Sequence, residues 1–341
     1  MIRATLLMAA TLAITSCAAP PPDPLSYLPP PNDAPTLERP VIDEEPWPLI
    51  ADSGRRITPP SWRLYTTAPP LSAIDDRLPA LLEAALSEYT SRDADLPMPS
   101  EPLDVYVLRS RTQWAALTQR LTPEHADRLL RIQRGGYTLD RKSVLFDIGA
   151  RDTLALAVHE GWHLYTQSTF RDPLPLWLED GLAVSMEVAR TDAVRCRPVL
   201  NAWANVERFD QLRAAAATGA LLSLTELLQS SPARLVQAHA STDTALTWYA
   251  QTWALVQFLR EHDAARYRPA LRRLLNAAQS GRLRQRLGGR SLARVTSGPA
   301  VFAAYFGDPA VLEPEYRAFI ERMTGVGAKD AIVAGRSPLT R

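Results

Sequence analysis

The sequence predicts an α+β protein in which a small mixed sheet is followed by a mostly helical C-terminal half. Short runs in the first half, such as Trp62–Thr67, alternate apolar and polar residues, as β-strands do. After about residue 150, almost every segment has the apolar spacing of a helix. At 341 residues, with 46% hydrophobic content, the chain can form one large domain or two modest ones.

The elements expected before the middle of the chain follow in order. Strands are predicted at 62–67 and 103–108, and helices at 73–89, 111–120 and 123–133. Gly135-Gly136 then interrupts the chain, and strands at 137–139 and 143–148 form a hairpin around Asp140-Arg141-Lys142. A buried helix follows, capped by Asp152 or Thr153.

This buried helix contains two of the five histidines of the chain, in the order His159-Glu160-Gly161-Trp162-His163. Residues four apart project from one face of a helix, so the two imidazoles can bind one divalent metal, most often zinc. Glu160 lies one step round the helix, where it can accept a proton from a water that the metal activates. The alternative is an amphipathic helix with two incidental histidines, but buried polar groups need partners, which favours the metal.

The N-terminus has the features of a secretion signal. Arg3 precedes an apolar stretch that is too short to span a bilayer, and the stretch ends at Ile14-Thr15-Ser16-Cys17. These four residues resemble the lipobox of bacterial lipoproteins, which implies a signal peptide at 1–16 and a lipidated Cys17. With Ala18 next, the resemblance implies an anchor in the outer membrane of the bacterial cell envelope, on the periplasmic side. An ordinary signal peptide is the alternative.

Residues 17–60 are expected to be a tether, because 13 of the 29 prolines of the chain fall between 18 and 60. The folded domain is predicted at 61–325, followed by a C-terminal tail at 326–341. Cys196 is the only other cysteine, so the fold is not expected to depend on a disulfide. The net charge of +1 gives no reason to expect a nucleic acid, and the arginines between 260 and 294 indicate solvated helix faces.

A catalytic zinc site usually has three protein ligands and a position open for water. Downstream of the histidines, Glu179 and Asp180 interrupt the apolar segment Pro173–Ala183 at the start of a predicted helix. Acidic residues also stabilise helix N-termini through the helix dipole, so this segment alone leaves a structural explanation open.

The two segments together resemble the gluzincin metallopeptidases of the peptidase MA type. In these enzymes HExxH is followed by Trp-Leu-x-Glu-Gly-x-Ala, whose Glu is the third zinc ligand. Tyr249–Leu259 is similar to the Tyr-Ala-Gln-x-Trp helix of the group, and the resemblance covers roughly 60–325. It implies a zincin-like fold. The residue at the ligand position is Asp180 rather than Glu, so Asp180 is the expected third ligand and Glu179 the alternative.

Two further residues are candidates for the same site. Glu187, seven positions after Asp180, would share its helical face and orient a ligating imidazole. Tyr249 would donate its phenol to the developing oxyanion, a role that some gluzincins give to a tyrosine. A solvated acid and a core tyrosine are the respective structural alternatives.

The sequence therefore predicts a zinc-dependent peptidase, with Glu160 as general base, a peptide or protein substrate and a membrane anchor through lipid. The alternative is a catalytically inactive zincin-like lipoprotein that binds or scaffolds other molecules. The aspartate at the ligand position favours this second interpretation.

Overall fold

The structure is a computed structural model that describes residues 43–192, 197–239, 243–288 and 296–340. The predicted signal peptide, Cys17, the first part of the tether and Cys196 lie outside the described residues. The chain divides into two compact units. Among the described residues, the first comprises those within 43–88, 99–168 and 189–200, and the second those within 89–98, 169–188 and 201–340. The region predicted as one domain at 61–325 thus contributes to both units.

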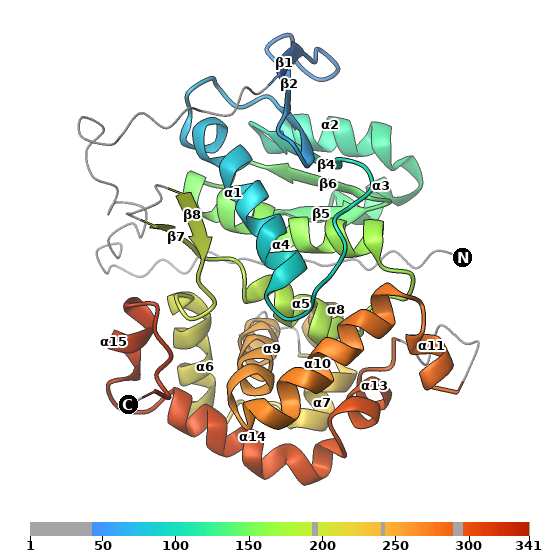
Figure 1. Cartoon of the computed structure of the whole chain (residues 1–341). Coiled ribbons are helices and arrows are strands. Elements are labelled where there is room, and N and C mark those ends of the chain that lie inside the picture. Colours follow the sequence, from blue (N-terminus) through green and yellow to red (C-terminus); the bar gives the residue numbers. More distant parts are fainter. Residues whose placement is uncertain (1–42, 193–196, 240–242, 289–295, 341) are drawn as a thin grey trace. The chain divides into compact units, whose positions relative to one another are not determined.

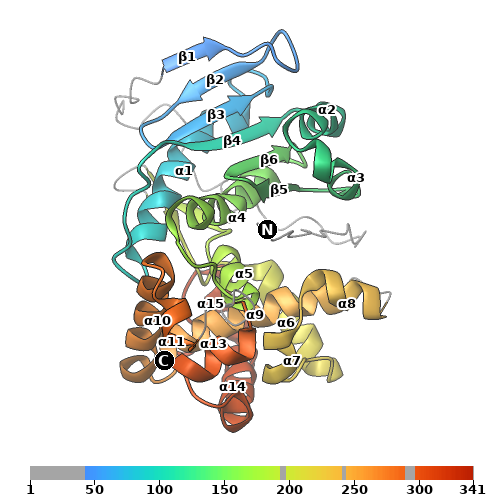
Figure 2. The same ribbon diagram turned by 90° about the vertical axis from the view of Figure 1, so that its right-hand side faces the viewer.

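The first unit contains a mixed six-stranded sheet, which confirms an α+β class (Figure 1). Its order is β1-β2-β3-β4-β6-β5, as Figure 2 shows. The strands are β1 (Asp43–Pro46), β2 (Arg55–Thr58), β3 (Trp62–Thr66), β4 (Leu103–Leu108), β5 (Gly136–Leu139) and β6 (Lys142–Phe146). The pairs β3–β4 and β4–β6 are parallel, and the other pairs are antiparallel. The first two strands lie within the range predicted as a tether.

The helices of this unit are α1 (Ala73–Ser91), α2 (Arg111–Leu121), α3 (Ala126–Leu129) and α4 (Ala150–Thr169), with a 3₁₀ turn η1 at Pro123–His125. The helix predicted at 123–133 is shorter than expected. The carbonyls of Leu130 and Ile132 accept hydrogen bonds from the Arg111 side chain, at 2.7 and 3.2 Å, instead of continuing a helix. A two-stranded ribbon, β7 (Ala189–Asp192) with β8 (Arg197–Leu200), completes the unit.

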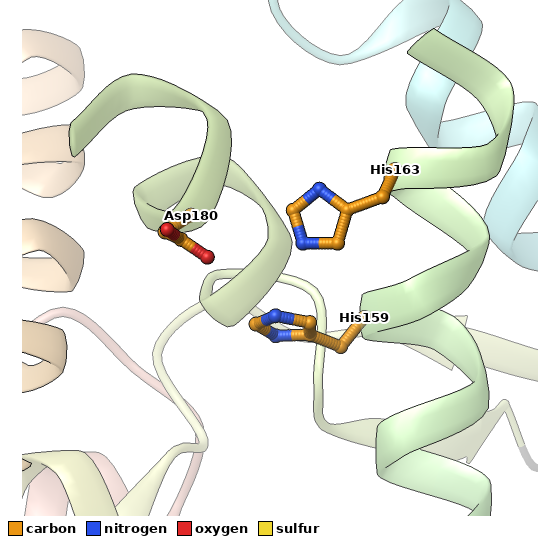
Figure 3. Close-up of side chains that lie close together, drawn as sticks. All are labelled: His159, His163 and Asp180. Carbon is orange, nitrogen blue, oxygen red and sulfur yellow. The ribbon is translucent and has the colours of Figure 1, made fainter. Parts of the chain in front are cut away.

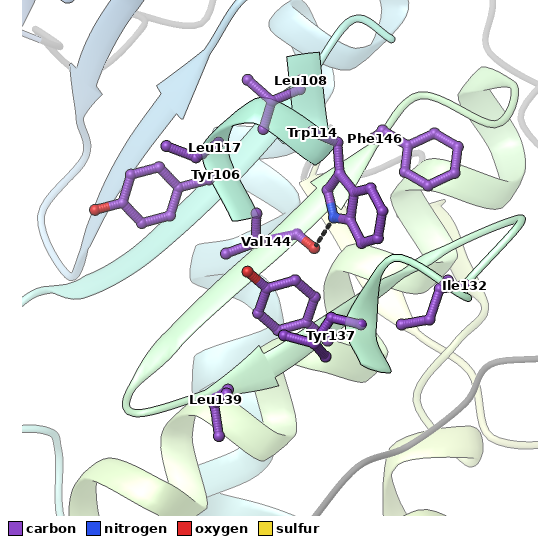
Figure 4. Packing of buried hydrophobic residues seen from close by; sticks show 10 residues of the cluster. Tyr106, Leu108, Trp114, Leu117, Ile132, Tyr137, Leu139, Val144 and Phe146 are labelled. Carbon is purple, nitrogen blue, oxygen red and sulfur yellow. Dashed lines mark hydrogen bonds between the residues drawn. The ribbon is translucent and has the colours of Figure 1, made fainter. Parts of the chain in front are cut away.

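The two faces of the sheet pack against different helices, and alternate side chains of each strand point to opposite faces. On one face, an apolar cluster joins β4, β5 and β6 to α2 (Figure 4). Trp114 of α2 lies at its centre, fully buried, and its indole N–H donates to the carbonyl of Val144 at 3.0 Å. The opposite face carries Thr138 and Ser143, whose hydroxyls both approach the carbonyl of Glu160 in α4 at 3.1 Å. The helix with the histidine motif therefore covers the face opposite α2.

The second unit is helical and is built around α9 (Asp243–Glu261). The other helices are α5 (Leu176–Val184), α6 (Val206–Thr218), α7 (Leu224–Gln229), α8 (Pro232–His239), α10 (Ala264–Gln279), α11 (Leu283–Arg286), α13 (Gly298–Tyr305), α14 (Pro309–Met323) and α15 (Ala328–Val333). α9 is buried along nearly its whole length, the pattern of a helix that is enclosed by others. α15 lies within the predicted tail and packs against α6.

Buried aromatic residues join α9 to its neighbours through their polar atoms. The indole N–H of Trp253 donates to the carbonyl of Ala202, and that of Trp248 donates to Leu227, both at 3.0 Å. The Tyr316 hydroxyl donates to the Gln251 carbonyl at 2.6 Å. Because each polar end is hydrogen-bonded, no donor of these three rings is buried without an acceptor. Within the described residues, none of the helices combines the length and the apolar character that a membrane span requires.

Candidate metal centre

The two histidines of the motif lie on one face of α4, as their spacing predicts. Their ring centroids are 5.0 Å apart, with one ring edge-on to the other at 71°. His159 is only 4% exposed and His163 only 3%. Two imidazoles held side by side within the protein are suited to bind one metal ion.

Asp180 supplies the third donor of the group. A nitrogen of each imidazole and a carboxylate oxygen of Asp180 all lie within 4.8 Å of one another (Figure 3). Asp180 is fully buried. Burial of a carboxylate is costly unless a charge compensates it, and a divalent cation bound by two neutral imidazoles would do so. The buried group of His159, His163 and Asp180 can therefore bind a metal ion.

Glu179, the alternative third ligand, differs from Asp180 in its position. It lies in the first turn of α5, is 8% exposed, and does not belong to the group that can hold a metal among the described residues. Successive residues of a helix point about 100° apart, so two neighbouring acids cannot share one direction.

A close helix crossing fixes where Asp180 lies on its own unit. A Cβ built on Gly181 would be 2.8 Å from the carbonyl oxygen of Thr252 and 2.8 Å from Cγ2 of Val256. Only a glycine allows α5 to approach α9 so closely. Close packing of the two helices therefore explains why a glycine follows Asp180 in the sequence motif. The same packing sets the position of Asp180 on α5.

Glu160, the predicted base, is fully buried and follows His159 directly in α4. Its Oε2 accepts a hydrogen bond of 2.6 Å from the Thr138 hydroxyl. Its Oε1 is also buried, and no hydrogen-bond donor approaches it among the residues that the structure describes. A buried carboxylate oxygen without a donor is costly in a folded protein, and a bound water would satisfy it.

Glu187 follows the end of the helix that carries Asp180. α5 ends at Val184, so the expected shared helical face with Asp180 does not extend to Glu187. The Glu187 carboxylate accepts from Asn205 Nδ2 at 3.0 Å and from Arg208 Nη2 at 3.5 Å. The charges of Glu187 and Glu207 raise the pKa of Arg208 against the opposing effect of burial. The polar residues Asn205 and Arg208, to which the sequence assigned no role, thus hold Glu187.

Tyr249 is buried in α9, at 3% exposure. The Arg208 guanidinium lies over its ring, 5.3 Å from the centroid, close enough for a cation–π contact. Tyr249 and Thr252 are three residues apart and share a face of α9, and Thr252 contacts Gly181. Tyr249 therefore lies one turn from the crossing that positions Asp180.

The contribution of Thr138 was not foreseen from the sequence. A threonine and a serine among apolar residues of a predicted hairpin are weak signals, because such residues are common in strands. Their partner, Glu160, lies 22 residues after Thr138 in the chain. Only the pairing register of the hairpin, combined with its packing on α4, brings the hydroxyl to the carboxylate.

Comparisons of the chain with protein-family models, with curated proteins and with solved structures found no match.

Proposed function

We propose that this protein is a zinc-dependent peptidase of the gluzincin type with a zincin-like fold. The observation that carries the proposal is the buried group of His159, His163 and Asp180, with the buried Glu160 carboxylate on the same helix as the two histidines. Two imidazoles and one carboxylate are the donors of many catalytic zinc sites, and three protein ligands leave one position open for water.

The donor set fits zinc better than it fits a hard cation. Calcium and magnesium prefer six or more oxygen ligands, whereas imidazole nitrogen suits zinc and other transition metals. When bound, zinc would polarise the substrate carbonyl and lower the pKa of the attacking water. The ion would also compensate the charge of Asp180, which is fully buried.

The residues of the chain supply the proton transfers and the orientation. Glu160 would accept the proton of the attacking water at Oε1 and deliver it to the leaving amine. Its Oε2 is already held by Thr138 at 2.6 Å, so Oε1 is the oxygen left for the water. Tyr249 would donate its phenol to the oxyanion that develops on the substrate.

The Glu160→Gln variant tests the proposal. It keeps the shape of the side chain but removes the base, so it should retain stoichiometric zinc by elemental analysis and lose peptide hydrolysis by at least about 100-fold. Unchanged hydrolysis would refute the role of Glu160. Purified protein that contains no zinc and cannot be reconstituted with it would refute the metal.

The inactive lipoprotein is the second candidate, and the aspartate at the expected glutamate position is the observation that favours it. Asp is one methylene shorter than Glu, and this shortens its reach by about 1.5 Å. A peptide-library assay with the zinc-loaded protein separates the two candidates. The binding or scaffold function predicts no cleavage with any divalent metal.

We further propose that the protein is anchored to the bacterial outer membrane through lipid on Cys17, facing the periplasm, with a peptide or protein as substrate. More than one acyl chain is needed for stable anchoring, which is what a lipoprotein cysteine carries. Cys17→Ser should release the protein into the soluble fraction. A membrane-bound Cys17→Ser variant would refute the anchor and leave the peptidase proposal intact.

A further inference from the structure

We propose that Thr138 is a positioning residue for the general base: its hydroxyl holds one oxygen of the Glu160 carboxylate and leaves the other for the attacking water. This inference rests on the proposed peptidase function. Thr138 belongs to strand β5 and lies on the face of the sheet opposite the apolar cluster.

The hairpin fixes the place of Thr138. β5 and β6 are joined by Asp140 and Arg141, whose φ angles of 49° and 57° are both positive. Two successive positive φ angles are typical of a type I′ turn, which sets the register of a two-residue hairpin. In this register Thr138 pairs directly with Ser143. A slip of one residue would turn the hydroxyl of the slipped strand to the opposite face and separate Thr138 from Ser143.

The hairpin is also fastened to α4. Gln167 of α4 accepts a hydrogen bond from the Arg141 backbone N–H at 3.3 Å and donates to the Thr138 carbonyl at 3.3 Å. The turn and the strand are therefore both tied to the helix that carries Glu160. This attachment holds the Thr138 hydroxyl at a fixed place relative to the carboxylate.

The hydroxyls of Thr138 and Ser143 form a chain of hydrogen bonds that ends on the Glu160 carboxylate. The donors in this chain follow from the number of hydrogens that each group carries. Thr138 Oγ1 lies 2.6 Å from Glu160 Oε2 and 2.7 Å from Ser143 Oγ. An ionised carboxylate only accepts, so Thr138 donates its single hydroxyl hydrogen to Oε2. Ser143 then donates to Thr138 Oγ1 or to the Glu160 carbonyl, 3.1 Å away. Each hydroxyl hydrogen has an acceptor, and Oε2 has a short charge-assisted bond.

The bond from Thr138 would orient the Glu160 carboxylate for catalysis. A general base works when its oxygen lies within hydrogen-bond reach of the proton that it accepts, and small displacements cost rate. A bond to Oε2 alone restrains rotation of the carboxylate and leaves Oε1 available. The purely structural alternative is that Thr138 only compensates the burial of Glu160. That alternative predicts a loss of stability without a specific loss of turnover.

The test uses three variants of the zinc-loaded full-length protein. Thr138→Val removes the hydroxyl at nearly constant shape, and Thr138→Ser restores it. Thr118→Val is the matched control, because Thr118 is also buried and its hydroxyl bonds to Tyr137, remote from Glu160. We expect Thr138→Val to lower kcat by about 10- to 100-fold with KM and zinc content unchanged, and Thr138→Ser to recover most of it. Thr118→Val should keep the wild-type kcat.

A wild-type kcat in Thr138→Val would overturn the inference, as would an equal loss in Thr118→Val. Crystal structures of the wild type and Thr138→Val provide a readout that does not need turnover. The Glu160 carboxylate should rotate away from its wild-type orientation in Thr138→Val and return in Thr138→Ser, and an unchanged orientation in all three proteins would refute positioning. If the wild type cleaves no peptide, the peptidase proposal fails, and the orientation of Glu160 still decides the role of Thr138.

Discussion

Gly181 and Thr252 meet where α5 packs against α9, and a Cβ on the glycine would lie 2.8 Å from the threonine carbonyl oxygen. A real Cβ does not tolerate that distance, and a backbone carbonyl cannot move without shifting its helix. Gly181→Ala should therefore separate the helices and lower the free energy of unfolding by about 1–3 kcal/mol. Urea denaturation of the purified protein measures this change.

Gly325→Ala is the control for that substitution. A Cβ on Gly325 would be 3.4 Å from its nearest neighbour, the carbonyl oxygen of Arg322, which is an ordinary contact. Its stability should change by less than about 0.5 kcal/mol. An equal loss in both variants would mean that close packing at Gly181 is not the cause. Because Asp180 precedes Gly181, zinc affinity should fall in Gly181→Ala and stay unchanged in Gly325→Ala.

Asp180→Ala and Glu179→Ala compare two neighbouring buried acids. Only Asp180 belongs to the group with the two histidines. Loss of a metal ligand should weaken zinc binding by more than the roughly 10- to 100-fold that loss of an outer partner costs. Competition with a chromogenic chelator measures both affinities. Equal affinities in the two variants, or a larger loss in Glu179→Ala, would contradict the assignment of Asp180.

The sequence predicted those parts of the site that depend on local spacing. His159 and His163 are one helical turn apart, so their shared face follows from helix geometry alone. Helix geometry alone does not decide between Glu179 and Asp180, because both lie in the same turn of a helix. The packing of that helix decides which of the two carboxylates joins the group with the histidines. Thr138 was beyond prediction because it contributes through hairpin register, a property of two strands together.

The strands of the sheet also differ in whether the local sequence predicts them. Leu103–Leu108 was predicted as a strand because its apolar residues suit a buried position, and β4 occupies that range. β1, with the sequence Asp-Glu-Glu-Pro, is exposed along its whole length and carries no apolar pattern. It is a strand because it pairs with β2 at the edge of the sheet, where charged residues and proline are common. Pairing of this kind leaves no periodic signal in the sequence.

Glycine substitutions at two adjacent residues of the β5–β6 hairpin should change the free energy of unfolding in opposite directions. Arg141 has a φ of 57°, which costs a residue with a Cβ about 1 kcal/mol more than it costs glycine. Arg141→Gly should therefore raise the free energy of unfolding by up to about 1 kcal/mol. Lys142→Gly, one residue later in β6, should lower it by about 0.5–1 kcal/mol, because glycine weakens a strand. Two losses in urea denaturation would contradict the turn assignment.

The capping box of α7 predicts a dependence on pH. Glu226 accepts from the Ser223 hydroxyl at 2.7 Å and from the Ser223 backbone N–H at 2.9 Å, and these bonds lower the pKa of Glu226. A carboxyl whose pKa is lower in the folded state stabilises the protein above its unfolded pKa. That stability is lost as the pH falls through the folded pKa. Glu226→Gln should therefore cost stability at pH 7, by less than about 1 kcal/mol for this exposed side chain, and less at pH 3.

Ser223→Ala provides the control for this pH effect. Without the Ser223 hydroxyl, which is the largest cause of the lowered pKa, the effect of Glu226→Gln should depend less on pH, and the backbone N–H of Ser223 accounts for part of what remains. Thermal unfolding of the four proteins at pH 7 and pH 3 closes the double-mutant cycle. A pH dependence that persists unchanged in the Ser223→Ala background would show that another group is responsible.

Asp93 and Arg260 form a largely buried ion pair that joins the segment after α1 to α9. The guanidinium Nε donates to Oδ1 at 2.8 Å and Nη2 donates to Oδ2 at 2.5 Å, with side chains 13% and 9% exposed for Asp93 and Arg260. Asp93→Ala leaves the arginine charge buried without its partner. It should lower the free energy of unfolding by about 3–5 kcal/mol, measured by urea denaturation.

Urea denaturation also separates the net contribution of the ion pair to the free energy of unfolding from the destabilisation caused by removing one partner. Replacing both residues, Asp93→Leu with Arg260→Met, removes both charges, so the double variant should be more stable than Asp93→Ala alone. Glu45→Ala breaks the exposed pair with Arg56, whose side chains are 59% and 38% exposed for Glu45 and Arg56, and should cost less than about 1 kcal/mol. If the double variant were as unstable as Asp93→Ala, lost packing rather than an isolated buried charge would explain the destabilisation.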